Sequence, residues 1–147
     1  MNIKAFLSPS GVVVDLRARD KVAVLEELSS RAAAVLNLPA EAIAHEIERR
    51  EELGSTGIGG GVSMPHARFR EVKKPFGLLA RLKQPVNFEA IDGQPVDLVF
   101  LLLLPASSQL DQLNTLAAVA RKLRDPNVLA DLRLATAASE LYKAVAA

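Results

Sequence analysis

The longest strongly apolar run of the sequence constrains the fold more than any other feature. It extends from Leu98 to Leu104, and it is far too short to span a bilayer, which takes about 20 apolar residues in a helix. Successive side chains of a strand point to opposite faces, so a run without polar alternation predicts a strand covered on both sides. We therefore expect Val96–Leu104 to form a central strand of a sheet and Pro105 to end it.

The rest of the chain alternates helical and strand patterns, with short connections and no internal repeat. A second long strand is predicted at Gly77–Leu82. Capping and stop signals predict helices from Asp20 to about Asn37, from Pro39 to about Glu52, from Ser107 or Ser108 to about Leu123, from Asp125–Pro126 onward, and over 137–145. This alternation predicts a compact α/β domain.

Apolar residues at helical spacing indicate which face each long helix buries. In the first helix they are Val22, Leu25, Leu28, Ala32, Val35 and Leu36. In the second helix they are Ile43 and Ile47. In the helix after the apolar strand they are Leu110, Leu113, Leu116, Ala117, Ala120 and Leu123.

Composition argues against several classes of function. The absence of cysteine rules out disulfides and thiolate metal sites. A net charge of +1, with five Phe, one Tyr and no Trp, gives little basis for binding nucleic acid. Residues 1–9 lack the apolar core of a signal peptide. We expect a cytoplasmic protein without membrane insertion.

Residues 55–68 place one of the two histidines behind a glycine-rich turn and a proline. Pro65 has a fixed φ and holds the preceding residue extended. The neutral imidazole of His66 is a competent nucleophile near pH 7, and Arg68 supplies a fixed positive charge. The segment therefore predicts phosphoryl transfer to and from His66. A structural or solvent-exposed histidine is the competing interpretation.

The glycines of this segment do not form a nucleotide-binding loop, because no Gly-Lys-Ser/Thr continuation follows them. We expect Gly59, Gly60 and Gly61 to form a tight hairpin turn between short strands. We also expect their amides to donate to a phosphoryl group on His66.

Two stretches of the sequence carry a family resemblance. The first contains Arg50-Glu51, Thr56-Gly57-Ile58-Gly59 and Pro65-His66, and the second is 85–100. Together they resemble the mannitol/fructose-type IIA domain of the bacterial phosphoenolpyruvate-dependent phosphotransferase system, particularly its nitrogen-regulatory branch. The resemblance covers nearly the whole chain. It implies one domain over residues 1–147, with a mixed β-sheet flanked by helices.

The resemblance also implies a reaction. His66 would take a phosphoryl group on Nε2 from the small carrier HPr or a paralogue, and no cofactor is required because the donor brings the activated group. Thr56 would bond a phosphoryl oxygen, although it is also a typical residue to start a strand. Arg50 would clamp the phosphate or pair with an acidic group of a partner, although it lies on a charged helix end.

Gln112 is predicted to occupy the place of a second histidine found in sugar-transporting relatives. Its amide can donate to a phosphoryl oxygen or to the imidazole but cannot titrate near neutral pH. Asn114 is rotated about 200° away on the helix. The other histidine, His45, is expected to be an exposed helix residue, and no metal site is predicted.

The sequence thus predicts a phosphocarrier that accepts phosphate on His66 and regulates downstream protein targets through its phosphorylation state. Two alternatives stay open. One is a sugar-transport IIA subunit that passes phosphate to a membrane permease, and the other is an interaction module that no longer cycles phosphate. Whether the protein is an enzyme is also open, because the phosphohistidine would be an intermediate of a transfer chain.

Overall fold

The apolar strand lies inside a mixed sheet, as predicted. A computed structural model describes residues 2–107 and 109–147, and within them six strands form a sheet with the order β1-β5-β6-β3-β2, in which β4 also pairs with β6. The strands are β1 (Val12–Leu16), β2 (Gly57–Gly59), β3 (Val62–Ser63), β4 (His66–Phe69), β5 (Phe76–Val86) and β6 (Val96–Pro105). β6 runs antiparallel to β5 and parallel to β3 and β4.

Side chains of β6 alternate between two buried clusters, one on each face of the sheet. Val99, Leu101 and Leu103 belong to one cluster. Leu98, Phe100, Leu102 and Leu104 belong to the other. The strand is therefore apolar throughout because both of its faces are covered.

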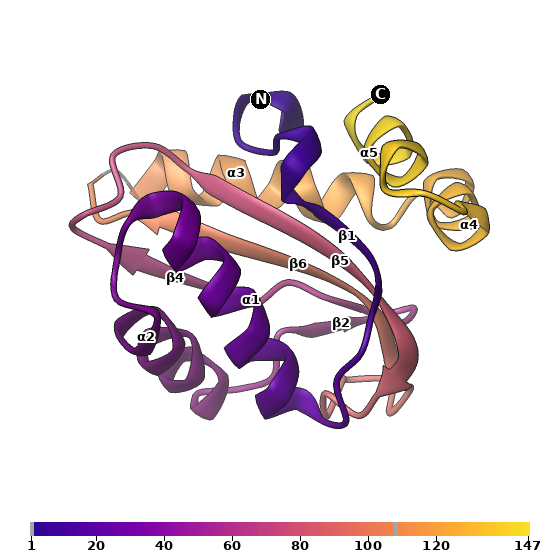
Figure 1. Cartoon of the computed structure of the whole chain (residues 1–147), viewed down its shortest axis with the longest axis horizontal. Helices are drawn as coiled ribbons and strands as arrows, with labels where there is room; N and C mark the ends of the chain where they lie inside the picture. Colours follow the sequence, from indigo (N-terminus) through magenta and orange to yellow (C-terminus); the bar gives the residue numbers. More distant parts are fainter. Residues whose placement is uncertain (1, 108) are drawn as a thin grey trace.

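Helices cover the two faces of the sheet (Figure 1). On one face lie α1 (Lys21–Leu36) and α2 (Ala40–Glu52). On the other lie α3 (Gln109–Lys122), α4 (Pro126–Leu134) and α5 (Ala138–Ala146), together with the short helices η1 (Ile3–Ala5) and η2 (Pro9–Gly11). The result is the predicted α/β domain with a mixed sheet between helices.

The predicted ends of the first two helices are confirmed. Asp20 caps α1, because its Oδ1 accepts a hydrogen bond from the amide of Ala23 at 2.9 Å. Asn37 ends α1 with a left-handed φ of 56°. Ile43 and Ile47 of α2 are buried, as predicted. Ser108, one of the two residues predicted to open α3, lies outside the described residues.

The predicted faces of α1 and α3 are partly wrong. Val22 and Val35 lie in the end turns of α1 and are 52% and 65% exposed. In α3, Leu110, Leu113 and Ala117 are exposed, and the buried residues are Thr115 and Val119. Thr115 tolerates burial because its hydroxyl donates to the carbonyl of Asp111 at 2.9 Å. The face of α3 towards the sheet is therefore rotated away from the leucine stripe.

Candidate functional site

His66 is the first residue of β4 and lies beside Leu102 of β6 in parallel register. Leu102 belongs to the cluster under α3, and Leu103 to the cluster under α1 and α2. Because side chains alternate along a strand, His66 and Arg68 point towards the α3 side and Ala67 towards the other. Consistent with this, Ala67 packs on the α1/α2 cluster.

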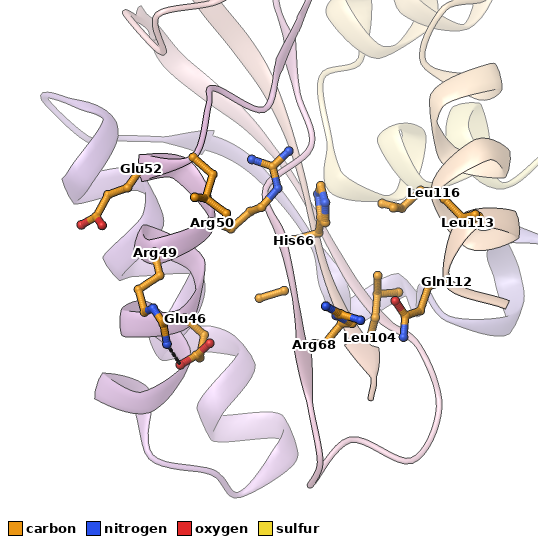
Figure 2. Close-up of a pocket in the computed structure, with 12 residues that line it drawn as sticks. Glu46, Arg49, Arg50, Glu52, His66, Arg68, Leu104, Gln112, Leu113 and Leu116 are labelled. Carbon is orange, nitrogen blue, oxygen red and sulfur yellow. Dashed lines mark ion pairs between the residues drawn. The ribbon is translucent and has the colours of Figure 1, made fainter. Parts of the chain in front are cut away.

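A cavity of about 630 Å³ opens where β4 meets the C-terminal end of α2 and the start of α3. Its lining includes His66, Arg50, Arg68 and Gln112, so four of the residues predicted for the site come together. Figure 2 shows Arg50 and Arg68 on two sides of the imidazole, with Gln112 on the facing helix. The structure thus surrounds one half-buried histidine with two guanidinium groups.

A hydrogen bond determines which nitrogen of His66 is available. Nδ1 lies 2.8 Å from the carbonyl oxygen of Met64. A carbonyl can only accept, so Nδ1 carries the hydrogen and donates it. In the neutral ring the lone pair is then on Nε2. The sequence did not select a nitrogen, whereas this contact selects Nε2.

The surroundings of His66 keep its ring neutral. Burial lowers the pKa of His66 below its usual value of 6.5, because desolvation disfavours the charged imidazolium. The bond to Met64 raises the pKa, the charge of Arg50 lowers it, and the charge of Glu51 raises it. Since the net direction is downward, the imidazole is a free base and hence nucleophilic at neutral pH.

Two other cavity residues have defined hydrogen bonds. Arg50 donates through Nη1 to the carbonyl of Gly54 at 2.8 Å, which anchors the guanidinium at the end of α2. Gln112 donates through Nε2 to the carbonyl of Pro105 at 2.9 Å. Its amide nitrogen is therefore bonded to the end of β6 rather than to the imidazole. Asn114 is exposed and outside the cavity lining, as its rotation on the helix predicts.

Thr56 lies outside the cavity lining as well. It is 4% exposed, and its hydroxyl donates to Oε1 of Glu51. The hydroxyl also lies 3.1 Å from that of Ser63. The structure therefore places the Thr56 side chain in a buried polar cluster with Glu51 and Ser63. The resemblance implied instead a contact with a phosphoryl oxygen on His66, at the cavity that Thr56 does not line.

The glycine turn forms the predicted hairpin, but away from His66. Gly59, Gly60 and Gly61 have φ values of 93°, 66° and 79°, as the turn requires. The hairpin strand β3 pairs with β6 at Leu98, four residues before the His66 partner Leu102, which is about 13 Å along a strand. The amide of Gly60 donates to Asp92 at 3.0 Å. The glycines thus shape the hairpin and do not line the cavity.

Sequence reasoning missed two groups of residues near the site. Glu51 and Lys21 form an ion pair of 2.7 Å that belongs to the Thr56 cluster. They are far apart in the sequence, and no local pattern connects them. Leu53 and Leu113 line the cavity and are 86% and 62% exposed. Leu113 was predicted to lie in the core. Its exposed position at the cavity follows from the rotation of α3, which the sequence did not reveal.

His45 is exposed on α2, as predicted. Among residues 2–107 and 109–147, no three His, Cys, Asp or Glu side chains are grouped so that they could hold a metal ion. In the same part of the chain, no helix combines the length and the apolar character that crossing a membrane requires.

Comparison with known proteins identifies the family to which the fold belongs. The family described as "Phosphoenolpyruvate-dependent sugar phosphotransferase system, EIIA 2" matches residues 5–147. The nitrogen regulatory protein of Bradyrhizobium diazoefficiens is 40% identical over 146 residues, which are 99% of this chain and 95% of the relative. That of Escherichia coli strain K12 is 40% identical over 131 residues, 88% of this chain and 80% of the relative.

Solved structures show the same fold. The crystal structure of nitrogen regulatory protein IIA-Ntr from Neisseria meningitidis has a TM-score of 0.92 and 32% identity, covering 97% of this chain and 98% of that one. IIA mannitol from Escherichia coli has a TM-score of 0.80 and 17% identity, covering 95% and 99%.

The fold and the family match thus define a IIA-type phosphotransferase-system domain. This chain belongs to the EIIA-2 family of the phosphoenolpyruvate-dependent sugar phosphotransferase system, and its curated relatives include nitrogen regulatory proteins.

Proposed function

We propose that this protein is a regulatory phosphocarrier that accepts a phosphoryl group on Nε2 of His66 from an HPr-like donor and signals through its phosphorylation state. The observation that carries the proposal is the His66 ring, whose Nδ1 is held by Met64 while Arg50 and Arg68 flank it in an accessible cavity. The names of the relatives support the regulatory part of the proposal.

The proposed transfer exchanges one P–N bond for another. The Nε2 lone pair of His66 attacks the phosphorus of a protonated donor phosphohistidine. The donor P–N bond breaks, its electron pair returns to the donor ring, and the donor leaves as a neutral imidazole. Nδ1 of His66 keeps its proton and its hydrogen bond to the Met64 carbonyl. Arg50 and Arg68 offset the charge of the arriving phosphoryl group.

The same proposal places residues 1–147 in the cytoplasm as one IIA domain. The family match over residues 5–147 supports the single domain. A phosphoryl group adds up to about two negative charges beside Arg50 and Arg68, and so it can switch the binding of a partner protein.

Phosphate labelling tests the proposal. The wild-type protein is incubated with phosphoenolpyruvate and the upstream carriers, and acid-labile phosphate is located by mass spectrometry. We expect one phosphate on His66, its loss in His66→Ala, and full labelling in the matched variant His45→Ala. Undiminished labelling of His66→Ala would overturn the assignment. A wild-type protein that stays unlabelled would instead be an interaction module.

A second measurement separates regulation from sugar transport. A verified partner should bind the phosphorylated and unphosphorylated forms with different affinities. Equal affinities would remove the proposed switch for that partner. Rapid onward transfer to a cysteine of a IIB domain would identify a transport subunit instead.

A further inference from the structure

We propose that Glu51 is a positioning residue for His66: held by Lys21, its carboxylate fixes Thr56 and, through Thr56, the Met64 carbonyl that orients the imidazole. The proposal deepens the proposed function and rests on it only for the effect on phosphoryl transfer. Its structural part concerns the unphosphorylated protein.

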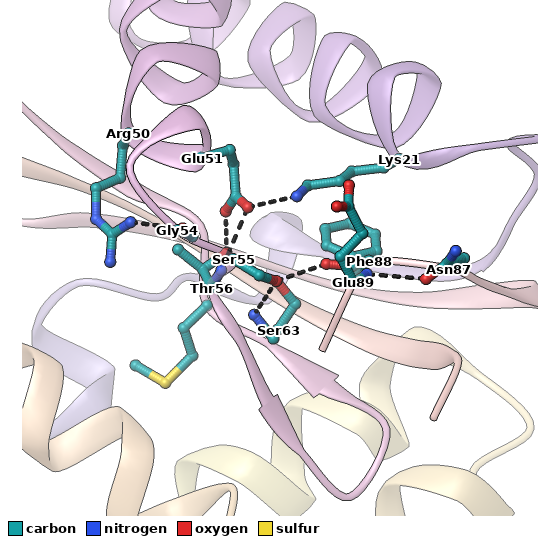
Figure 3. Close-up of polar contacts among 12 residues, drawn as sticks. Lys21, Arg50, Glu51, Gly54, Ser55, Thr56, Ser63, Asn87, Phe88 and Glu89 are labelled. Atoms are coloured by element: carbon teal, nitrogen blue, oxygen red, sulfur yellow. Dashed lines mark hydrogen bonds and ion pairs between the residues drawn. The ribbon is translucent and has the colours of Figure 1, made fainter. Parts of the chain in front are cut away.

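Glu51 is the centre of a buried polar network that joins α1, α2 and the segment before the hairpin (Figure 3). Its Oε2 lies 2.7 Å from Nζ of Lys21 and accepts the amide hydrogen of Thr56 at 3.2 Å. Its Oε1 accepts the Thr56 hydroxyl. The Lys21 and Glu51 side chains are only 17% and 6% exposed. One carboxylate thus binds both the backbone and the side chain of Thr56.

A second set of contacts continues from Thr56 to the imidazole. The carbonyl of Thr56 accepts the amide hydrogen of Met64 at 3.0 Å. The Thr56 hydroxyl lies 3.1 Å from the Ser63 hydroxyl. The carbonyl of the same Met64 accepts the Nδ1 hydrogen of His66 at 2.8 Å. The backbone of Met64 is therefore bonded to Thr56 through its amide and to His66 through its carbonyl. A shift of Thr56 moves Met64 and, with it, the oxygen that orients the imidazole.

Pro65 makes this connection stiff. Its φ is restricted by the ring, and its carbonyl accepts the amide hydrogen of Leu102 at 2.9 Å. The backbone between Met64 and His66 therefore has little freedom to rotate, and a displacement of Met64 also displaces His66. Without the Met64 contact, nothing in the described hydrogen bonds of His66 selects the tautomer with Nε2 free.

Glu51 also follows Arg50 directly in α2. Arg50 donates to Gly54, and Glu51 binds Thr56, so the two residues hold the segment after α2 from adjacent positions. Their opposite charges act on His66 in opposite directions: Glu51 raises its pKa and Arg50 lowers it. The end of α2 therefore influences both the geometry and the electrostatics of the imidazole.

A purely structural ion pair is the competing explanation. Buried ion pairs often contribute little net stability, because desolvation offsets their attraction. The two explanations differ in what Glu51→Gln does to the folded protein. A structural pair changes the unfolding midpoint alone, whereas a positioning residue also changes the imidazole tautomer in molecules that remain folded.

The test measures ¹⁵N chemical shifts of the imidazole in unphosphorylated protein at pH 7.5, in a His45→Ala background that leaves one histidine. We expect the Nδ1–H tautomer to predominate in the parent and the Nε2–H tautomer to become substantial in Glu51→Gln. Phosphoryl acceptance from the HPr-like donor should fall about tenfold, as expected when a nucleophile is misplaced. Since the tautomer is read without a donor, failure of the proposed function would not obscure it.

Matched variants keep the test decisive. Asp97→Asn weakens the Arg133–Asp97 ion pair of 2.9 Å, which lies outside the His66 cavity, and it should change neither tautomer nor rate. Thr56→Val removes the hydroxyl at similar volume and should act like Glu51→Gln, whereas Thr56→Ser should restore the parent behaviour. If Glu51→Gln does not fold, the comparison of Thr56→Val with Thr56→Ser tests the proposal. An unchanged tautomer in a folded Glu51→Gln or Thr56→Val protein would overturn the proposal.

Discussion

The imidazole Nδ1 of His66 lies 2.8 Å from the carbonyl oxygen of Met64, on the other side of Pro65. The nitrogen whose lone pair stays free is thus selected by the backbone two residues away, and not by a second side chain. Under the proposed function the orienting contact is on Nδ1, so it can persist while Nε2 gains and loses the phosphoryl group.

The first prediction concerns the site of phosphorylation within the ring. Because Nδ1 donates to Met64, the phosphoryl group should be found on Nε2. Two-dimensional ¹H–¹⁵N spectra of the phosphorylated protein distinguish the two isomers. Phosphate on Nδ1 would mean that the Met64 bond breaks before transfer.

The second prediction concerns pH. The pKa of His66 is lowered in the folded protein, so the ring should stay neutral, and phosphoryl acceptance should persist, at a pH somewhat below 6.5. Well above pH 6.5 the ring is neutral in both the folded and the unfolded state and contributes nothing to the pH dependence of stability. As the pH falls through 6.5 towards the folded-state pKa, the unfolded chain binds the proton first, and stability decreases.

An NMR titration of His66 in the His45→Ala background checks this. Arg50→Gln should raise the midpoint, because it removes a positive charge that lowers the pKa of His66. Arg17→Gln, at a position outside the cavity, should leave the midpoint in place. A wild-type midpoint above 6.5 would contradict the inferred neutral ring.

The third prediction concerns Arg68, which lies on the same face of β4 as His66 and lines the cavity. Arg68→Gln should slow phosphoryl acceptance on the order of thirtyfold, the loss expected for one charge-assisted contact of about 2 kcal/mol. Arg17→Gln makes the same change of net charge elsewhere and is the control. Equal rates for the two variants would show that Arg68 acts only through long-range attraction.

The fourth prediction concerns docking of the donor. Leu53, directly after α2, and Leu113, within α3, are exposed on the rim of the His66 cavity. Exposed apolar side chains next to a reactive group are typical of a protein-binding surface. Leu113→Asp should raise the KM for the phosphorylated donor several-fold with little change in the rate at saturation. Val35→Asp, which alters a 65% exposed residue of α1, should leave both constants unchanged.

Sequence patterns predicted the elements and the histidine better than the contacts between elements. The apolar run of β6, the Asp20 cap and the glycine hairpin are encoded locally, so each could be read from a few neighbouring residues. Strand β1 was missed, because Val12–Leu16 is short and pairs with β5 far along the chain.

The candidate site shows the same division. His66, Arg50, Arg68 and Gln112 could be named from motif positions, and they meet in one cavity. The burial of Thr56 and its bond to Glu51 depend on how α2 packs beside the hairpin, and the exposure of Leu113 depends on the rotation of α3. Neither is encoded in the spacing of residues along the chain.

The last prediction concerns Gln112, which faces the cavity from α3 and donates to Pro105 at 2.9 Å. An amide cannot titrate near neutral pH, so it offers a transferring phosphoryl group neither a proton nor a positive charge. A second imidazole at this position could supply both. The difference of one charge-assisted contact is on the order of 2 kcal/mol, or about thirtyfold in rate.

Gln112→His should therefore speed transfer between the HPr-like donor and His66 in both directions, by up to about thirtyfold. Asn114→His is the matched control, because Asn114 is exposed on the same helix and lies outside the cavity lining. Rapid-quench measurement of the three proteins compares the rates directly. If Gln112→His transfers phosphate no faster than the wild type, then this position does not control the chemistry, and the flanking arginines supply the charge that the transition state needs.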